Sequence, residues 1–333
     1  MLPLAQQEGF PYYVQNGRYV LNDGDWGGGF FIGILWHYYQ MLREDGNTEE
    51  AERVLRLIRR KMEELAPLRF RPTFDVGFMF FYSAVRGYQI LGDGQWLQYA
   101  RDAVETQKSR FHPAARMIYH DYRFDERRYT GSIIDTLPDV VLLWWAAKEL
   151  KDVESEELVI THFRRIAELL LRDDGSVWQT VWFDPETGAV LFRENFQGDT
   201  SDGVWSRGQA WGILGFAQAW HYTGNNDYRA YAERLAEYFL ANVNADGTVP
   251  WDFRSERRDI LDNSAAVIAL TGAKILNDSD PRWHRVEEAL QPFIAPSGKE
   301  GLLDGATFFV RREWGVMSPN IWGDFFWIES QVM

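Results

Sequence analysis

Residues 205–222 read WSRGQAWGILGFAQAWHY, and the helix predicted here is apolar on almost every side from Ile213 onward. Helices that are apolar all round are buried. The start of this stretch is different, because two tryptophans bracket an arginine and a glutamine: Trp205, Arg207, Gln209 and Trp211. The start can therefore be the end of a core helix, or one wall of a pocket in which a sugar stacks on aromatic rings.

Five other stretches are also apolar nearly all round, and they begin at Gly27, Asp75, Ser132, Asp262 and Trp322. Between them lie charged, amphipathic stretches, which begin at Thr48, Gly94, Ser155, Asn226 and Pro281. Turn residues separate the two kinds. Strict alternation of buried and half-exposed helices predicts a closed ring of helical hairpins, each of which buries one helix inside. We therefore expect an all-α protein, an (α/α)6 barrel, in a single domain over residues 1–333.

Two segments depart from the helical pattern. Residues 177–194, VWQTVWFDPETGAVLFRE, alternate around a turn sequence and predict a β-hairpin. Residues 305–316, GATFFVRREWGV, are strand-like but weaker. We expect both segments in loops between helices, at one end of the barrel.

The composition excludes several classes of function. A net charge of −14 and a pI near 5.0 do not suit a nucleic-acid-binding protein. There is no basic amphipathic helix for a membrane surface and no apolar run long enough to span a bilayer. The chain has no cysteine, so disulfides and thiolate chemistry are excluded. The first residues do not resemble a signal peptide, and a cytoplasmic location is the simplest interpretation.

The side chains suited to metals or cofactors give no pattern either. The six histidines are scattered without metal-ligand spacing, so we expect neither a metal nor a cofactor. Among them, His120 beside Asp121 in a predicted loop is the one of interest. The 15 tryptophans raise the expectation of carbohydrate chemistry, although most tryptophans are core residues.

Polar residues stand where the apolar helices are expected to begin: Trp26, Asp75, Asp135, Arg207, Gln209, Asp262, Asn263 and Asp324. If the inner helices are parallel, these starts open at one end of the barrel and converge. Asp and Asn are also favoured N-caps, so Asp75, Asp262 and Asp324 can each be simple caps. Asp135 lies inside its predicted helix among apolar residues, where a carboxylate is costly unless it faces a cavity.

The helix starts, taken in order, resemble a known family. WGGGFFIGILW, FDVGFMF, SIIDTLPDVVLLWWA, SDGVWSRGQAWGILGFA, DNSAAVIAL and IWGDFFWIES are similar to the unsaturated glucuronyl hydrolases of glycoside hydrolase family 88, over residues 10–331. The resemblance implies the same (α/α)6 barrel. It also implies substrates left by polysaccharide lyases, with a 4,5-unsaturated uronic acid at the non-reducing end. The implied reaction hydrates the C4=C5 enol ether, after which the ring opens and the aglycone leaves.

The resemblance also implies roles for individual residues. Asp135 matches the acid/base position and Asp75 the second carboxylate. The implied substrate-binding residues are Trp26, Arg207, Gln209, Trp211 and Asn263. A small oligosaccharide is the expected partner, with no cofactor and no metal.

Two departures from the family pattern stand out. Phe196-Gln197-Gly198 replaces a sequence that often reads His-Gln-Gly, which puts the substrate preference in question. The first outer helix is also expected to be missing, so that a second copy could cover an inner helix, and the protein is expected to be a monomer or a homodimer. Three alternatives stay open: an unsaturated rhamnogalacturonyl hydrolase, an inverting glycosidase on saturated substrates, and a sugar-binding module without activity.

Overall fold

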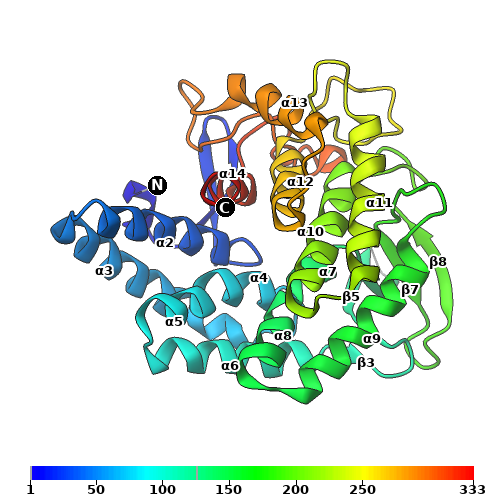
Figure 1. The fold of residues 1–333 in the computed structure, drawn as a ribbon, viewed down its shortest axis with the longest axis horizontal. Helices are drawn as coiled ribbons and strands as arrows, with labels where there is room; N and C mark the ends of the chain where they lie inside the picture. The colour runs from blue at the N-terminus through cyan, green and yellow to red at the C-terminus, as the bar shows by residue number, and fades with distance from the viewer. Residues whose placement is uncertain (1, 125–126) are drawn as a thin grey trace.

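Two concentric sets of helices form the molecule (Figure 1). A computed structural model describes residues 2–124 and 127–333. In this described part, six helical segments form the inner wall: α2 (Gly28–Glu44), α4–α5 (Val76–Phe80 and Arg86–Leu91, joined by a π-helical turn), α7–α8 (Thr136–Asp139 and Val141–Trp145), α10 (Ser206–Thr223), α12 (Asn263–Leu276) and α14 (Ile321–Val332). Five outer helices alternate with them: α3 (Thr48–Leu65), α6 (Gly94–Lys108), α9 (Val153–Leu170), α11 (Asn226–Asn242) and α13 (Pro281–Leu290). The predicted (α/α)6 barrel, with five outer helices among the described residues, is confirmed.

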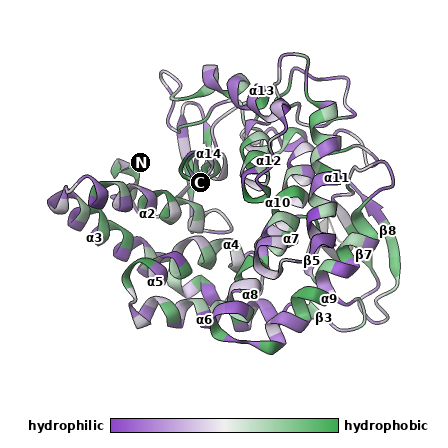
Figure 2. Ribbon diagram, viewed as in Figure 1, coloured by the Kyte–Doolittle hydropathy of each residue, from purple (hydrophilic) through white to green (hydrophobic). Residues whose placement is uncertain are grey.

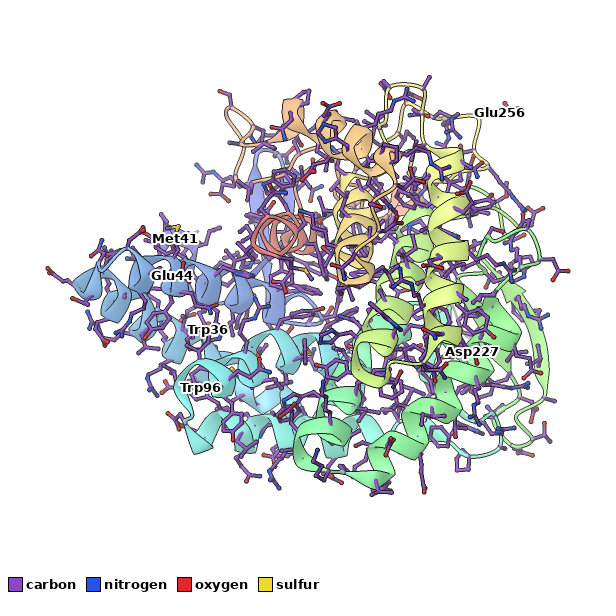
Figure 3. The ribbon with its side chains drawn as sticks, viewed as in Figure 1. Trp36, Met41, Glu44, Trp96, Asp227 and Glu256 are labelled. Carbon is purple, nitrogen blue, oxygen red and sulfur yellow. The ribbon has the colours of Figure 1, made fainter. Side chains whose placement is uncertain are left out.

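The outer helices are buried on one side and the inner helices on all sides, because their apolar side chains are distributed differently. On α3, the residues Val54, Ile58, Met62 and Leu65 recur at helical spacing and are buried, while charged residues cover the other side (Figure 2). On α10, all residues from Ser206 to Ala219 are buried. Aromatic rings fill the space between the two sets. Trp36 of α2 and Trp96 of α6, for example, meet edge to face with ring centroids 5.4 Å apart (Figure 3).

The outer and inner helices also differ in whether a side chain caps their first turn. Each outer helix is capped by the side chain of an Asn or Asp just before it, which accepts a hydrogen bond from a first-turn amide: Asn47, Asp93, Asp152, Asn225 and Asp280. Four inner helices, α2, α4, α7 and α10, have no such bond from their N-cap side chain. An uncapped helix start leaves amide groups for another partner. These four helix starts surround a pocket, which contains the candidate active site.

Short strands occupy the loops. The predicted hairpin is β7 (Thr180–Phe183) with β8 (Val190–Glu194), and it is confirmed. It belongs to a four-stranded antiparallel sheet in the order β5–β6–β7–β8, with β5 at His120–Phe124 and β6 at Arg127–Ile133. A second hairpin joins β1 (Phe10–Gln15) to β2 (Arg18–Asn22), and β3 (Phe111–His112) pairs with β4 (Met117–Ile118).

Two predicted boundaries are wrong. Ser132 and Ile133 belong to strand β6, and the helix expected from Ser132 begins at Thr136, because the edge of β7 takes up their backbone hydrogen bonds. Residues 305–316 do not form a strand; a 3-10 turn at Val310–Arg312 and a single bridge between Phe309 and Trp314 fold this segment back on itself. None of the described helices is both long and apolar enough to cross a membrane.

Candidate active site

A pocket of about 470 Å³ opens at the starts of four inner helices. It is lined by Trp26, which precedes α2, by Asp75 before α4, by Asp135 before α7, and by Arg207 in the first turn of α10. These four predicted residues therefore meet at one mouth, although up to 181 positions separate them in the chain (207 − 26). The starts of α12 and α14 do not line it, so the expected convergence of six starts is reduced to four.

A larger groove of about 1120 Å³ is lined by residues of α2, α5 and α14. Three of its ionisable side chains are paired with one another. The Glu329 carboxylate binds the Arg86 guanidinium at 2.7 Å and the His37 ring at 2.5 Å. Because the smaller pocket holds two carboxyl groups of raised pKa, Asp75 and Asp135, we place the chemistry there.

Asp135 is the most unusual residue in the pocket. It occupies the N-cap position of α7 without capping it, and its Oδ1 atom is buried with no hydrogen-bond partner among the described residues. Loss of solvation raises the pKa of its carboxyl to about 7, against the nearby positive charge of Arg207. The indole N–H of Trp211 also lowers this pKa, although it stands outside full hydrogen-bonding geometry. Since Asp135 caps nothing, its polar atoms are left for a ligand.

Asp75 has a similar environment on the neighbouring inner helix. Its side chain does not cap α4, and instead accepts a hydrogen bond of 2.5 Å from the hydroxyl of Thr73. Desolvation raises its pKa to about 7, opposed by the Thr73 bond, and the charges of Asp25 and Asp135 add to the rise. The simple-cap interpretation of Asp75 is therefore wrong, because its carboxylate faces the pocket.

Arg207 lines the pocket, but most of its donors are already used inside the protein. Its guanidinium pairs with the buried Asp262 carboxylate at 2.7 Å and donates to the carbonyls of Thr307 and Phe308. It also lies flat over the Trp205 ring, at 4.4 Å from the ring centroid. Arg207 therefore ties the pocket wall to the loop before α14 and leaves only part of its donor set for a substrate.

Three residues predicted to bind sugar do not line the pocket. Gln209 is fully buried on another face of α10: its amide donates to the carbonyls of Gly175 and Leu235 and accepts from Val177 N–H. Asn263 is buried and donates to the Asp304 carbonyl. These hydrogen bonds occupy the Gln209 amide and a donor of Asn263, and neither residue lines the pocket, so the structure does not support the sugar-binding prediction for Gln209 and Asn263. Trp211 packs behind the wall against Phe78, with ring centroids 5.1 Å apart, and offers only its N–H toward Asp135.

The aspartates at the last two helix starts are structural. Asp262 caps α12 by accepting from Ser264 N–H at 3.1 Å, besides pairing with Arg207. Asp324 accepts hydrogen bonds from the Tyr19 hydroxyl and from two backbone amides of the preceding loop. Both carboxylates are buried away from the pocket, so the cap interpretation is correct for Asp262, and Asp324 anchors a loop.

Replacement of Gln209 by Leu should therefore lower stability and leave substrate binding almost unchanged. Leucine fills a similar volume but leaves the Gly175 carbonyl and the Val177 amide without their Gln209 partner in the core. We expect a loss of about 2–4 kcal/mol in the free energy of unfolding, with KM within about a factor of two at a temperature where the variant is folded. Urea unfolding and steady-state kinetics check this, and a large rise in KM with normal stability would restore Gln209 to the sugar site.

The sequence did not single out several other pocket residues. Aromatic rings from two loops complete the wall, namely Tyr12, Phe308, Phe309 and Trp314. Asp25 brings a third carboxylate, and Gln197 lines the pocket while its side chain accepts from Gln179 at 2.6 Å. Phe196 and His120, which the sequence did single out, also line it, and desolvation lowers the pKa of His120 to about 4, so its ring is neutral there. None of these residues lies in a helix, so no helical pattern points to a shared surface.

Metal binding is a separate question for this pocket. The described residues contain no group of three His, Cys, Asp or Glu side chains arranged to bind a metal ion. It does offer two half-buried carboxyl groups of raised pKa, which face a space walled by aromatic rings and lined by the arginines Arg71, Arg207 and Arg312. Raised carboxyl pKa values in a concave site are typical of general acid–base catalysis, and aromatic walls suit sugars. The barrel and this site define a carbohydrate-active enzyme.

Comparison with known proteins agrees with that class. No protein-family model matches the chain. The unsaturated glucuronyl hydrolase of Bacillus sp. (strain GL1) is 33% identical, over 96% of this chain and 89% of the relative. Its crystal structure, described as that of an enzyme responsible for the degradation of glycosaminoglycan, gives a TM-score of 0.86 and covers 97% of this chain and 90% of that one. An unsaturated chondroitin disaccharide hydrolase of Streptococcus pyogenes serotype M1 is 27% identical, over 96% and 84% of the two chains.

A further solved structure, an unsaturated glucuronyl hydrolase specific for heparin, has 25% identity and a TM-score of 0.86, covering 99% of this chain and 92% of that one. With one relative above 30% identity along nearly the whole chain, membership is clear. The chain belongs to the unsaturated glucuronyl hydrolases of glycoside hydrolase family 88.

Proposed function

We propose that this protein cleaves oligosaccharides that carry a 4,5-unsaturated uronic acid at the non-reducing end. The observation that carries the proposal is the pair Asp75 and Asp135, two carboxyl groups with pKa values raised to about 7 in one sugar-sized pocket. Family membership supports the substrate class. The relatives named above act on different glycosaminoglycan-derived substrates, so the parent polysaccharide is left to experiment.

The proposed reaction is hydration of the C4=C5 double bond. Asp135, in its protonated form, gives its proton to C4, and the positive charge that develops at C5 and the ring oxygen is stabilised by the Asp75 carboxylate. Water adds to C5, and its proton passes to the Asp135 carboxylate. The resulting hemiketal opens and releases the aglycone, so that the elements of one water molecule are added overall. General acid–base catalysis of this kind contributes roughly 10²–10⁴-fold in rate.

The rest of the pocket is proposed to hold the sugar. The ring of Trp26, which packs at a tilt against Trp322 with ring centroids 4.5 Å apart, presents a flat aromatic surface at the mouth. The remaining donors of Arg207 and the uncapped start of α10 favour the negative charge of the uronate. Trp211 acts indirectly in this proposal, through its N–H toward Asp135.

One panel of substrates tests the function. Unsaturated chondroitin, heparin-type and rhamnogalacturonan disaccharides are incubated with the enzyme beside their saturated counterparts. Loss of the ultraviolet absorbance of the conjugated enol ether, with release of the second sugar, is the expected result for at least one uronyl substrate. Cleavage of the saturated compounds would favour an inverting glycosidase, preference for the rhamnogalacturonan product the rhamnogalacturonyl variant, and tight binding without turnover a sugar-binding module.

The pH dependence of the reaction should follow the coupled carboxyl pair. Because one group must be protonated and the other ionised, kcat/KM should fall above about pH 7, where the second proton is lost, and also at low pH, where both are protonated. The same carboxyl groups link folding stability to pH, because their pKa values are higher in the folded protein than in the unfolded chain. Their contribution to the free energy of unfolding is fully present below the pKa of the unfolded chain, and it is lost as the pH rises through about 7. Thermal unfolding at each pH separates loss of catalysis from loss of fold. A rate that is flat from pH 5 to 9 would contradict these assignments.

Three further predictions rest on the sequence alone. They are a cytoplasmic location, a single domain over residues 1–333, and a monomeric or homodimeric state. Light scattering of the purified protein measures the last of these directly.

A further inference from the structure

The helix that follows Asp75 is capped by a residue from another helix. Asp75 stands at the N-cap position of α4, where an Asp side chain usually accepts a bond from a first-turn amide. Here the amide of Phe78, in that first turn, donates at 2.5 Å to the Oδ1 atom of Asp139 instead. Asp139 lies at the end of α7, so α7 satisfies the start of α4 and Asp75 is released for its bond with Thr73.

The Asp139 side chain is held from both sides. It is completely buried, and the amide of Gln107 donates to its Oδ2 at 3.3 Å and to the Phe74 carbonyl at 2.9 Å. The two helices also touch through their backbones. A Cβ atom on Gly77 would lie 1.8 Å from the Asp139 carbonyl oxygen, so only glycine allows this approach. The start of α4 is thus fixed against Asp139 by one side-chain bond and one backbone contact.

The same short helix carries Asp135. Asp135 precedes α7 and Asp139 ends it, four residues or about one helical turn later. One side chain therefore ties the segment that bears Asp135 to the segment that bears Asp75. We propose that Asp139 is a positioning residue, which caps α4 in place of Asp75 and so keeps the Asp75 carboxylate in the pocket with Asp135. This inference rests on the proposed function, in which both aspartates act on the substrate.

The charged groups around Asp75 determine how its ionisation would change if Asp139 no longer capped α4. The acidic groups that act on it are Asp25, from the β2–α2 loop, and Asp135. The Asp139 carboxyl is a third acid close by. The other ionisable groups of the pocket are Arg71, Arg207, Arg312, the neutral His120 ring and the Tyr12 hydroxyl. Burial and the charges of Asp75 and Asp135 raise the pKa of Asp139 well above its usual range, so its role is that of a hydrogen-bond acceptor more than of a charge.

Loss of the acceptor should therefore redirect Asp75. Without Asp139, the free amides of α4 lie next to Asp75, which already occupies the N-cap position. A carboxylate that caps a helix is stabilised in its charged form, which lowers its pKa. Asp75 would leave the pocket and ionise more easily, whereas a residue that only adds packing would have no effect on ionisation.

The test compares Asp139→Leu, which removes the acceptor at similar volume, with Asp139→Asn, which keeps an oxygen for Phe78 N–H. For D139L we expect kcat to fall about a hundredfold, as for a misplaced catalytic group, with KM within about threefold. The Asp75 pKa, measured by carbon-13 NMR of the carboxyl groups without substrate, should fall by about one unit. D139N should restore kcat to within about threefold of the wild type and keep its Asp75 pKa.

Each outcome is decisive. A folded D139L enzyme with unchanged kcat and unchanged Asp75 pKa overturns the proposal, and so does a D139N enzyme as impaired as D139L, because the charge and not the acceptor would then matter. If D139L fails to fold, D139N alone decides: a wild-type kcat and titration support the proposal, and a shifted titration overturns it. Since the NMR titration needs no turnover, an inactive wild type would refute the proposed function and leave the positioning role measurable.

Discussion

Asp135→Asn should lower kcat on an unsaturated disaccharide by roughly 10²–10⁴-fold while the protein stays folded. The substitution keeps the shape of the side chain but removes the ionisable proton, and Asp135 is the group proposed to deliver that proton to C4. It makes no capping bond that the change would break, since its Oδ1 has no partner among the described residues. The loss of enol-ether absorbance with time measures the effect.

The stability of the same variant supplies a control. A carboxyl whose pKa is raised to about 7 destabilises the folded state once it ionises, and the neutral amide removes that penalty. D135N should therefore unfold at the same or a higher temperature than the wild type at pH 8. A variant that retains a tenth or more of the wild-type kcat would show that the proton comes from another group.

The barrel could be predicted from the sequence because its signal is periodic. Helices that are apolar all round and helices with a single apolar stripe differ in pattern, and their alternation sets the ring. The sheets were harder to predict, because their strands are short. The hairpin β1–β2 did carry a signal, since Asn16 and Gly17 form its turn with φ angles of 52° and 79°, the conformation that an Asn-Gly turn favours. Strand β6 carried none, since its pairing with β7 joins segments almost fifty residues apart.

The prediction of individual site residues was limited in the same way, because contacts between distant segments cannot be read from a local pattern. The spacing along α10 separates its polar residues: Arg207 and Trp211 lie four positions apart and share a face, while Gln209, two positions from each, points elsewhere. That rule could have removed Gln209 from the pocket before the structure did. The sequence could not show that Asp262, on another helix, takes up the Arg207 charge, because a pairing across 55 positions depends on how α10 and α12 pack.

Arg207→Met should destabilise the protein more than either Gln209→Leu or Asp135→Asn. The change leaves the fully buried Asp262 carboxylate with only neutral donors, and it removes the donor from the carbonyls of Thr307 and Phe308. Removal of one partner from a buried ion pair costs about 3–5 kcal/mol. Urea unfolding at pH 7 measures this loss. Arg207→Lys should recover only part of it, because an ammonium group cannot donate to the carboxylate and both carbonyls in the planar arrangement of a guanidinium.

Arg229→Met is the matched control for Arg207→Met. Arg229 pairs with Glu233 at 2.7 Å on the exposed side of α11, and an exposed pair at this spacing contributes only about 0.3–0.5 kcal/mol. The two variants lose the same charge, so the difference between them reports the buried Arg207–Asp262 pair together with the Arg207 hydrogen bonds to the two carbonyls. R207M should also change the pH profile of activity, measured at a temperature low enough for the variant to stay folded. Since the Arg207 charge lowers the pKa of Asp135, its removal should move the alkaline limb of the pH profile upward. Equal stabilities for the two variants would mean that Asp262 is solvated in solution, and an unmoved alkaline limb that Arg207 does not act on the catalytic proton.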